Sequence, residues 1–160
     1  MRKLVFLLIG SIVICSLSAC SDDDDKYESR LPIFNDISFS EERLLTDQRV
    51  TATAVQNSKG ILLDRVEYRW DANMYEPNDS TMSYVNAVLY TDNSTNPTCT
   101  FKTPEYPGRY RITFHGRYNI SGQSTNKTIS GTIPSGNAIY VYTPLMGEVT
   151  VVKSFTVYAR

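Results

Sequence analysis

The sequence predicts an all-β fold, an antiparallel sandwich of about seven or eight short strands. Apolar and polar residues alternate with a period of two along several segments, as in strands that bury one face. Clusters of Gly, Pro, Asn and Asp separate these segments. Residues 41–45 have helical character for one turn at most. We therefore expect strands throughout residues 32–160, a length that suits a single hydrophobic core.

The first half of this domain contains five of the expected strands. They span residues 33–39, 49–55, 65–70, 82–90 and a short segment around Cys99 and Phe101. Residues 57–60 carry the polar and glycine content of a turn. Residues 71–81 are polar over a longer stretch and are expected to form a loop.

Two strands define the expected core. Every second residue is apolar in residues 65–70, and the same holds in residues 109–118. The side chains expected to meet in the interior are Tyr68, Trp70, Ile112 and Phe114. Because successive strand residues point to opposite faces, the charged residues between them are expected in solvent.

The last part of the domain is less regular. Residues 119–136 are rich in Ser, Thr, Asn and Gly, which predicts either an elaborated loop or a thin hairpin that Tyr140 and Tyr142 would close. The final strand is expected at residues 149–158. We interpret its apolar residues as changing face near Lys153, which predicts a β-bulge there.

The order of these segments resembles immunoglobulin-like domains, and most closely their PKD-like variety. The resemblance rests on residues 50–54, on the Tyr68-x-Trp70-Asp71 strand and on the turn and strand of residues 106–112, which are similar to strands B, C and F of that fold. It implies that the strands at 65–70 and 109–118 are neighbours in one sheet. The alternative is a lipocalin-like up-and-down barrel, which would use the same alternation around a ligand cavity.

If those two strands are neighbours, their outer faces place basic side chains together beside a single acid, Glu67. The residues of this expected binding face are Arg65, Arg69, Arg109, Arg111, His115 and Arg117. Such a face could dock an acidic glycan or an acidic protein through charge-assisted hydrogen bonds. The simpler interpretation is that outward charges keep a solvated sheet from pairing with other sheets.

The N-terminus predicts an export signal followed by a lipid anchor. Arg2 and Lys3 precede an apolar run at residues 4–14, which is too short to cross a bilayer. Leu-Ser-Ala-Cys at residues 17–20 resembles the bacterial lipobox. The resemblance implies that residues 1–19 are removed and that Cys20 is fatty-acylated, so that a membrane is the first partner of the chain.

An acidic run follows Cys20 and resembles the export signal of surface lipoproteins of the Bacteroidota. Its residues are Ser21, Asp22, Asp23, Asp24 and Asp25. The resemblance implies a protein on the outer membrane that faces the medium. We expect residues 20–31 to form the lipidated start and a disordered tether, roughly 20 Å long on average and about 40 Å at most. Asp79, Ser80 and Thr81 resemble the O-glycosylation signal of exported proteins in the same group, with Ser80 as acceptor.

Composition argues against several function classes. The domain is close to neutral once the four tether aspartates are excluded, so we expect no nucleic-acid partner. The single histidine and the absence of a nucleophile elbow, a phosphate loop or a His and Cys cluster predict no enzyme, no cofactor and no metal. Cys99 has no partner left for a disulfide and is expected to be a small buried residue.

The sequence therefore favours a non-enzymatic surface lipoprotein that acts as a binding or interaction module, an accessory to glycan capture or adhesion. Two alternatives stay open. One is a structural or assembly subunit of an envelope complex, whose exposed sheet a partner protein covers. The other is a lipocalin-like carrier of a small ligand, which would require an apolar cavity.

Overall fold

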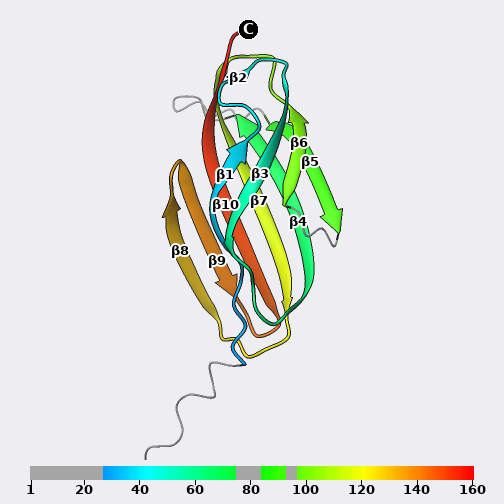
Figure 1. Cartoon of the computed structure of the whole chain (residues 1–160), viewed down its shortest axis with the longest axis vertical. Coiled ribbons are helices and arrows are strands. Elements are labelled where there is room, and N and C mark those ends of the chain that lie inside the picture. Colours follow the sequence, from blue (N-terminus) through cyan, green and yellow to red (C-terminus); the bar gives the residue numbers. More distant parts are fainter. Residues whose placement is uncertain (1–26, 75–83, 93–96) are drawn as a thin grey trace, which may run out of the picture.

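The computed structural model describes residues 27–74, 84–92 and 97–160 (Figure 1). This part of the chain is all-β and contains ten strands and no helix. They are β1 (Ile33–Phe39), β2 (Leu44–Leu45), β3 (Arg49–Ser58), β4 (Leu63–Met74), β5 (Tyr84–Asp92), β6 (Thr98–Lys102), β7 (Gly108–Ile120), β8 (Lys127–Ile133), β9 (Gly136–Tyr142) and β10 (Met146–Tyr158). Within these residues, no helix has the length and apolarity needed to span a bilayer.

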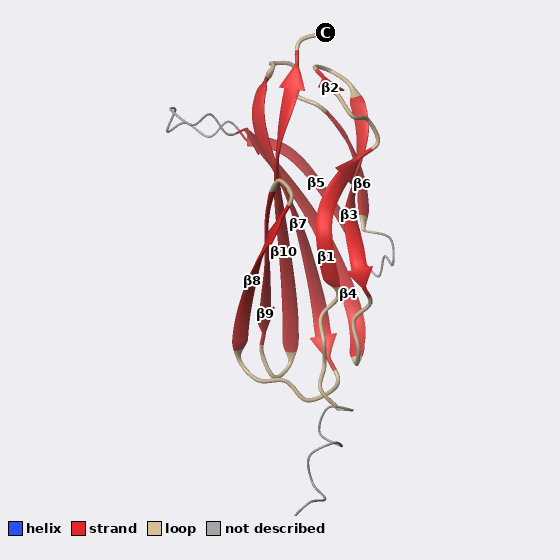
Figure 2. Cartoon of the chain, turned by 60° about the vertical axis from the view of Figure 1, so that its left-hand side comes forward, coloured by secondary structure: helices blue, strands red, loops and turns tan. Residues whose placement is uncertain are grey.

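The strands form two sheets that face each other as a sandwich (Figure 2). The smaller sheet has the order β1-β3-β6, and the larger has the order β5-β4-β7-β10-β9-β8, with β2 parallel to the end of β10. β3 pairs with β6 and β4 with β7, whereas an up-and-down barrel pairs strands that follow each other in sequence. The order is consistent with an immunoglobulin-like sandwich.

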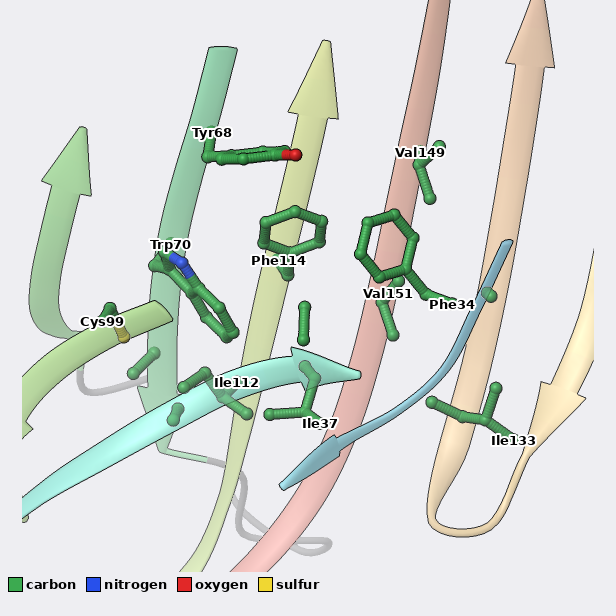
Figure 3. Packing of buried hydrophobic residues seen from close by; sticks show 14 of the residues in the cluster. Phe34, Ile37, Tyr68, Trp70, Cys99, Ile112, Phe114, Ile133, Val149 and Val151 are labelled. Atoms are coloured by element: carbon green, nitrogen blue, oxygen red, sulfur yellow. The ribbon is translucent and has the colours of Figure 1, made fainter. Parts of the chain in front are cut away.

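The core lies between the sheets and is centred on Phe114 (Figure 3). β4 and β7 pair so that Trp70 stands opposite Phe114, and all four side chains that were expected in the core are buried. The Phe114 ring lies 5.1 Å from the rings of both Trp70 and Tyr68. Phe34 from β1 approaches it to 5.0 Å from the opposite sheet. This aromatic cluster joins the two layers.

The segment with the less regular sequence forms a hairpin, β8 and β9, that widens the larger sheet beyond β10. The seven or eight expected strands become ten because of this hairpin and the short strand β2. Tyr140 and Tyr142 lie on β9 and face the edge of the smaller sheet. Their hydroxyls accept hydrogen bonds from the backbone N–H of Phe34 at 3.1 Å and of Leu31 at 3.3 Å. The tyrosines therefore attach the hairpin to the start of β1.

The prediction of a β-bulge near Lys153 was wrong. β10 keeps an unbroken register with both β7 and β9 through that residue. Every second residue of this strand points inward: Val149, Val151, Phe155 and Val157 are all buried. Lys153 occupies the inward position between Val151 and Phe155. Its ammonium donates a 2.9 Å hydrogen bond to Asp36 Oδ2 on β1 and lies over the Phe39 ring. Pairing with Asp36 lets a lysine occupy the core side without interrupting the strand.

Several expected boundaries also shift. Residues 28–31 were expected in the disordered tether, but Glu28 bridges to Gln123, Arg30 bridges to Ile61, and Ser29 and Leu31 are buried. Asn57 and Ser58 extend β3, and residues 71–74 extend β4 into the expected loop. Hydrogen bonds to neighbouring strands extend β3 and β4 past the segments in which apolar and polar residues alternate regularly. The other predicted N-terminal features, at Cys20, Ser21 and Asp22 to Asp25, lie outside the described residues, as does Ser80.

Trp70→Ala should lower the free energy of unfolding by about 3–5 kcal/mol, because it empties a site that is 1% exposed between the sheets. A urea melt of the purified protein measures this loss. Tyr106→Ala is the control, since that ring is 71% exposed and its removal should cost less than about 0.5 kcal/mol. Equal losses for the two variants would contradict the placement of Trp70.

Lys153→Met and Asp36→Leu should each cost about 1–3 kcal/mol, because each leaves one charge without its partner in a mostly buried position. The double variant should recover most of that loss, since no unpaired charge remains. A double-mutant cycle on unfolding free energies checks this, with an expected coupling of about 1 kcal/mol or more. Strictly additive losses would show that the pair does not connect the sheets energetically.

Candidate functional site

The outer face of the larger sheet carries the polar side chains that strand pairing brings together. Alternate residues of β7 point outward, and β7 lies between β4 and β10. In one cross-strand row Arg69, His115 and Thr150 stand side by side. In the next row Glu67, Arg117 and Glu148 do so. The sequence predicted that β4 and β7 are neighbours, but it did not predict β10 as the other neighbour of β7.

These two rows surround a shallow depression with a volume of about 380 Å³, which we call the His115 basin. Its lining residues come from β4, β7 and β10 and are Glu67, Tyr68, Arg69, His115, Gly116, Arg117, Glu148, Val149 and Thr150. The basin is open to solvent and polar around its rim. It is a surface site, distinct from the aromatic core beneath the same strands.

His115 connects two strands at the centre of the basin. Its Nε2 lies 3.3 Å from Asp71 Oδ2 on β4, and its Nδ1 lies 3.3 Å from Thr150 Oγ1 on β10. A carboxylate only accepts hydrogen bonds, so in the neutral ring Nε2–H donates to Asp71 and Nδ1 accepts from the Thr150 hydroxyl. The side chains of two neighbouring strands therefore fix the ring orientation and tautomer.

Burial lowers the pKa of His115 below its ordinary value of 6.5, the nearby Arg69 lowers it further, and Asp71 opposes both. The sequence placed His115 among arginines but did not place Asp71 beside it. Asp71 was expected in a loop, and β4 instead brings it onto the same face. The ring is therefore mainly neutral at pH 7 and offers hydrogen bonds more than charge.

The expected basic face is a mixed one. Arg69 pairs with Asp71 at 3.1 Å, and Arg117 pairs with Glu148 at 3.2 Å. Glu67 was expected to be the single acid, but Asp71 and Glu148 join it. Both arginine side chains are more than half exposed, so each ion pair contributes little to stability. Their guanidinium groups remain accessible to a ligand from solvent.

The other expected face residues lie away from the basin. Arg109 and Arg111 are further along β7, where Arg111 stands opposite Asn73 of β4 and Ser154 of β10. Thr113 separates them from His115 along the outward positions of β7. Arg65 lies in β4, and its side chain is outside the described part of the structure. The basin therefore includes three of the six expected residues, Arg69, His115 and Arg117. Arg109 and Arg111 lie outside it.

The basin offers donors and acceptors but few elements of a catalytic centre. A carboxylate, an imidazole and a hydroxyl are in line, yet both contacts are 3.3 Å long. Because β7 pairs on both sides, its backbone N–H groups serve the sheet ladder and not an oxyanion. Among the described residues, no group of three or more His, Cys, Asp or Glu side chains could hold a metal ion.

Comparisons with protein-family models, with curated proteins and with solved structures gave no significant match.

His115 should titrate below 6.5, and Asp71→Asn should lower its pKa further, because the variant removes the largest contribution that favours the charged ring. As the only histidine, it can be followed by NMR without assignment of other rings. Glu148→Gln is the control and should lower the pKa less.

The contribution of His115 to stability depends on pH. The unfolded chain binds the proton more readily, so the contribution of His115 to stability is complete above pH 6.5 and is lost as pH falls through the folded-state pKa. A measured pKa at or above 6.5 would contradict this environment.

Proposed function

We propose that the chain is a non-enzymatic surface lipoprotein, a PKD-like module that binds an acidic glycan in the His115 basin. In this proposal residues 1–19 are removed, and acylated Cys20 holds the domain to the outer membrane facing the medium. The lipobox-like residues 17–20 and the acidic run after them support the location. The mixed polar surface around His115 supports the activity.

The observation that carries the proposal is the position of two exposed guanidinium groups next to the His115 imidazole. Arg69 lies opposite His115, and Arg117 is the next outward residue on β7. Arg117 pairs with the half-exposed Glu148, which a ligand carboxylate can replace at small cost, whereas the Asp71 partner of Arg69 is only 21% exposed. Arginine forms paired hydrogen bonds with carboxylates, whereas His115 and Thr150 suit the hydroxyls of a sugar.

Binding is favoured over catalysis because the site lies on a strand that is paired on both sides. A glycan lying across β4, β7 and β10 would contact side chains alone, since the backbone hydrogen bonds of β7 are used within the sheet. Such side-chain contacts to a polymer are individually weak and become useful through repetition along the ligand.

One feature supports the alternative of an assembly subunit. Among the strands that the structure describes, β8 is an edge strand paired only with β9, and its residues from Thr128 to Thr132 are exposed. An exposed edge can accept a strand from another chain. A small-ligand carrier has less support, because the described interior is filled by the aromatic cluster around Phe114.

Arg69→Gln combined with Arg117→Gln should weaken binding to an acidic polysaccharide at least about tenfold, since two charge-assisted contacts are lost. Polygalacturonate is the probe, neutral dextran is the ligand control, and affinity is measured with the anchored protein at low salt.

Arg109→Gln combined with Arg111→Gln is the matched control, because it removes the same charge from the same face of the larger sheet outside the basin. It should change the affinity less than about threefold if binding is local. Equal losses for the two double variants would show nonspecific attraction. Absence of wild-type binding to polygalacturonate would contradict the acidic-glycan proposal.

A further inference from the structure

One end of the sandwich is closed by four consecutive residues, 120–123, which begin with the last residue of β7. Their backbone connects three segments that are distant in sequence. The N–H groups of Ile120, Ser121 and Gln123 donate to the carbonyl oxygens of Leu145, Leu62 and Tyr27 at 3.0, 3.0 and 2.6 Å. This end is therefore a single hydrogen-bonded unit rather than a set of independent loops.

Ser29 fixes the start of the described chain to the same unit. Its side chain is buried, its Oγ accepts a 2.9 Å hydrogen bond from Gly122 N–H, and its hydroxyl donates to Leu62 O at 3.0 Å. A Cβ at Gly122 would lie 2.4 Å from Tyr27 O and 2.6 Å from Leu62 Cδ1. The glycine thus permits a close approach that brings Tyr27 and Leu62 together.

The same unit exposes large apolar side chains, which we call the anchor-end patch: Tyr27, Ile61, Leu62 and Leu145. Tyr27 is 62% exposed and Leu145 is 76% exposed. Leu62 also has a φ of 54°, in the left-handed region that costs a non-glycine residue roughly 1 kcal/mol or more. The fold accepts both unfavourable exposure and backbone strain at this end.

Basic and acidic side chains border the patch. Arg30 forms a backbone bridge with Ile61, Lys59 is exposed in the same connection, and Glu28 pairs with both Arg30 and Lys127. Tyrosine and leucine beside lysine and arginine are typical of protein surfaces that lie at a lipid headgroup layer. The long basic side chains can extend toward phosphates while the apolar ones enter the boundary.

Chain length brings this end to the membrane if Cys20 carries lipid, and the inference therefore rests on the proposed anchor. Only residues 21–26 separate Cys20 from Tyr27, a connection that spans roughly 25 Å when fully extended. The described chain begins at this end, and its C-terminus lies at the opposite end of the long axis (Figure 1). Tyr106 and Tyr158, although exposed, belong to the distal end.

We propose that the anchor-end patch rests on the bilayer that holds Cys20, so that the lipid surface is its partner and the domain stands with its long axis away from the membrane. Tyr27, Ile61, Leu62 and Leu145 enter the headgroup boundary. The His115 basin, on the side of the sandwich, remains open to ligand.

Depth-dependent quenching tests this placement with the full acylated protein in phosphatidylethanolamine and phosphatidylglycerol vesicles. An environment-sensitive fluorophore is attached at Leu145→Cys or, as the distal control, at Tyr106→Cys. Cys99 should not compete, because it is buried and burial raises the pKa of its thiol to about 12. Nitroxide-bearing lipids should quench the label at residue 145 severalfold more than the label at residue 106.

A second variant tests the apolar contribution. With the label at Lys59→Cys, Ile61→Ser combined with Leu145→Ser should reduce the quenching severalfold, while Tyr106→Ser should leave it unchanged. Equal, weak quenching at residues 145 and 106 in protein that still floats with the vesicles would overturn the patch and leave the anchor intact. Failure to float, with Cys20 unmodified by mass spectrometry, would overturn both.

Discussion

The structure depends on the antiparallel pairing of β4 with β7. This register sets Trp70 opposite Phe114 and Arg69 opposite His115, so one alignment determines both the core and the outer surface. Because side chains alternate across a strand, a slip of one residue would place the aromatic rings in water and the charges between the sheets. The cost of that exchange makes the register and the surface site inseparable.

Polar contacts join the smaller sheet at β1 to strands β9 and β10 of the larger sheet. The hydroxyls of Tyr140 and Tyr142 bond to backbone at the start of β1, and Lys153 reaches Asp36 on the same strand. Aromatic packing joins the centre of the sheets, whereas these directional bonds set the distance of the β8–β9 hairpin from the smaller sheet. The edge strand β1 is thereby attached without a further strand ladder.

The two proposed surfaces differ in how the fold forms them. The His115 basin arises from side chains on regular, paired strands, whereas the anchor-end patch arises from connections held by backbone bonds to residues 120–123. A strand face offers repeated side-chain contacts to an extended ligand. The clustered loops of the anchor-end patch offer exposed apolar side chains to a lipid surface. In the two proposals, the patch at the end of the sandwich contacts the membrane while the basin on the sheet face binds ligand.

The sequence by itself determined the all-β class, most strand positions and the inward set of Tyr68, Trp70, Ile112 and Phe114, because period-two alternation is a local property. It also placed His115 and the arginines outward. Tertiary structure decided the rest: Asp71 and Glu148 as partners on the outer face, Lys153 as an inward residue paired with Asp36, and Ser29 as part of the folded end. Each of these depends on which strand or loop lies next to it, and long-range pairing leaves no periodic trace in the chain.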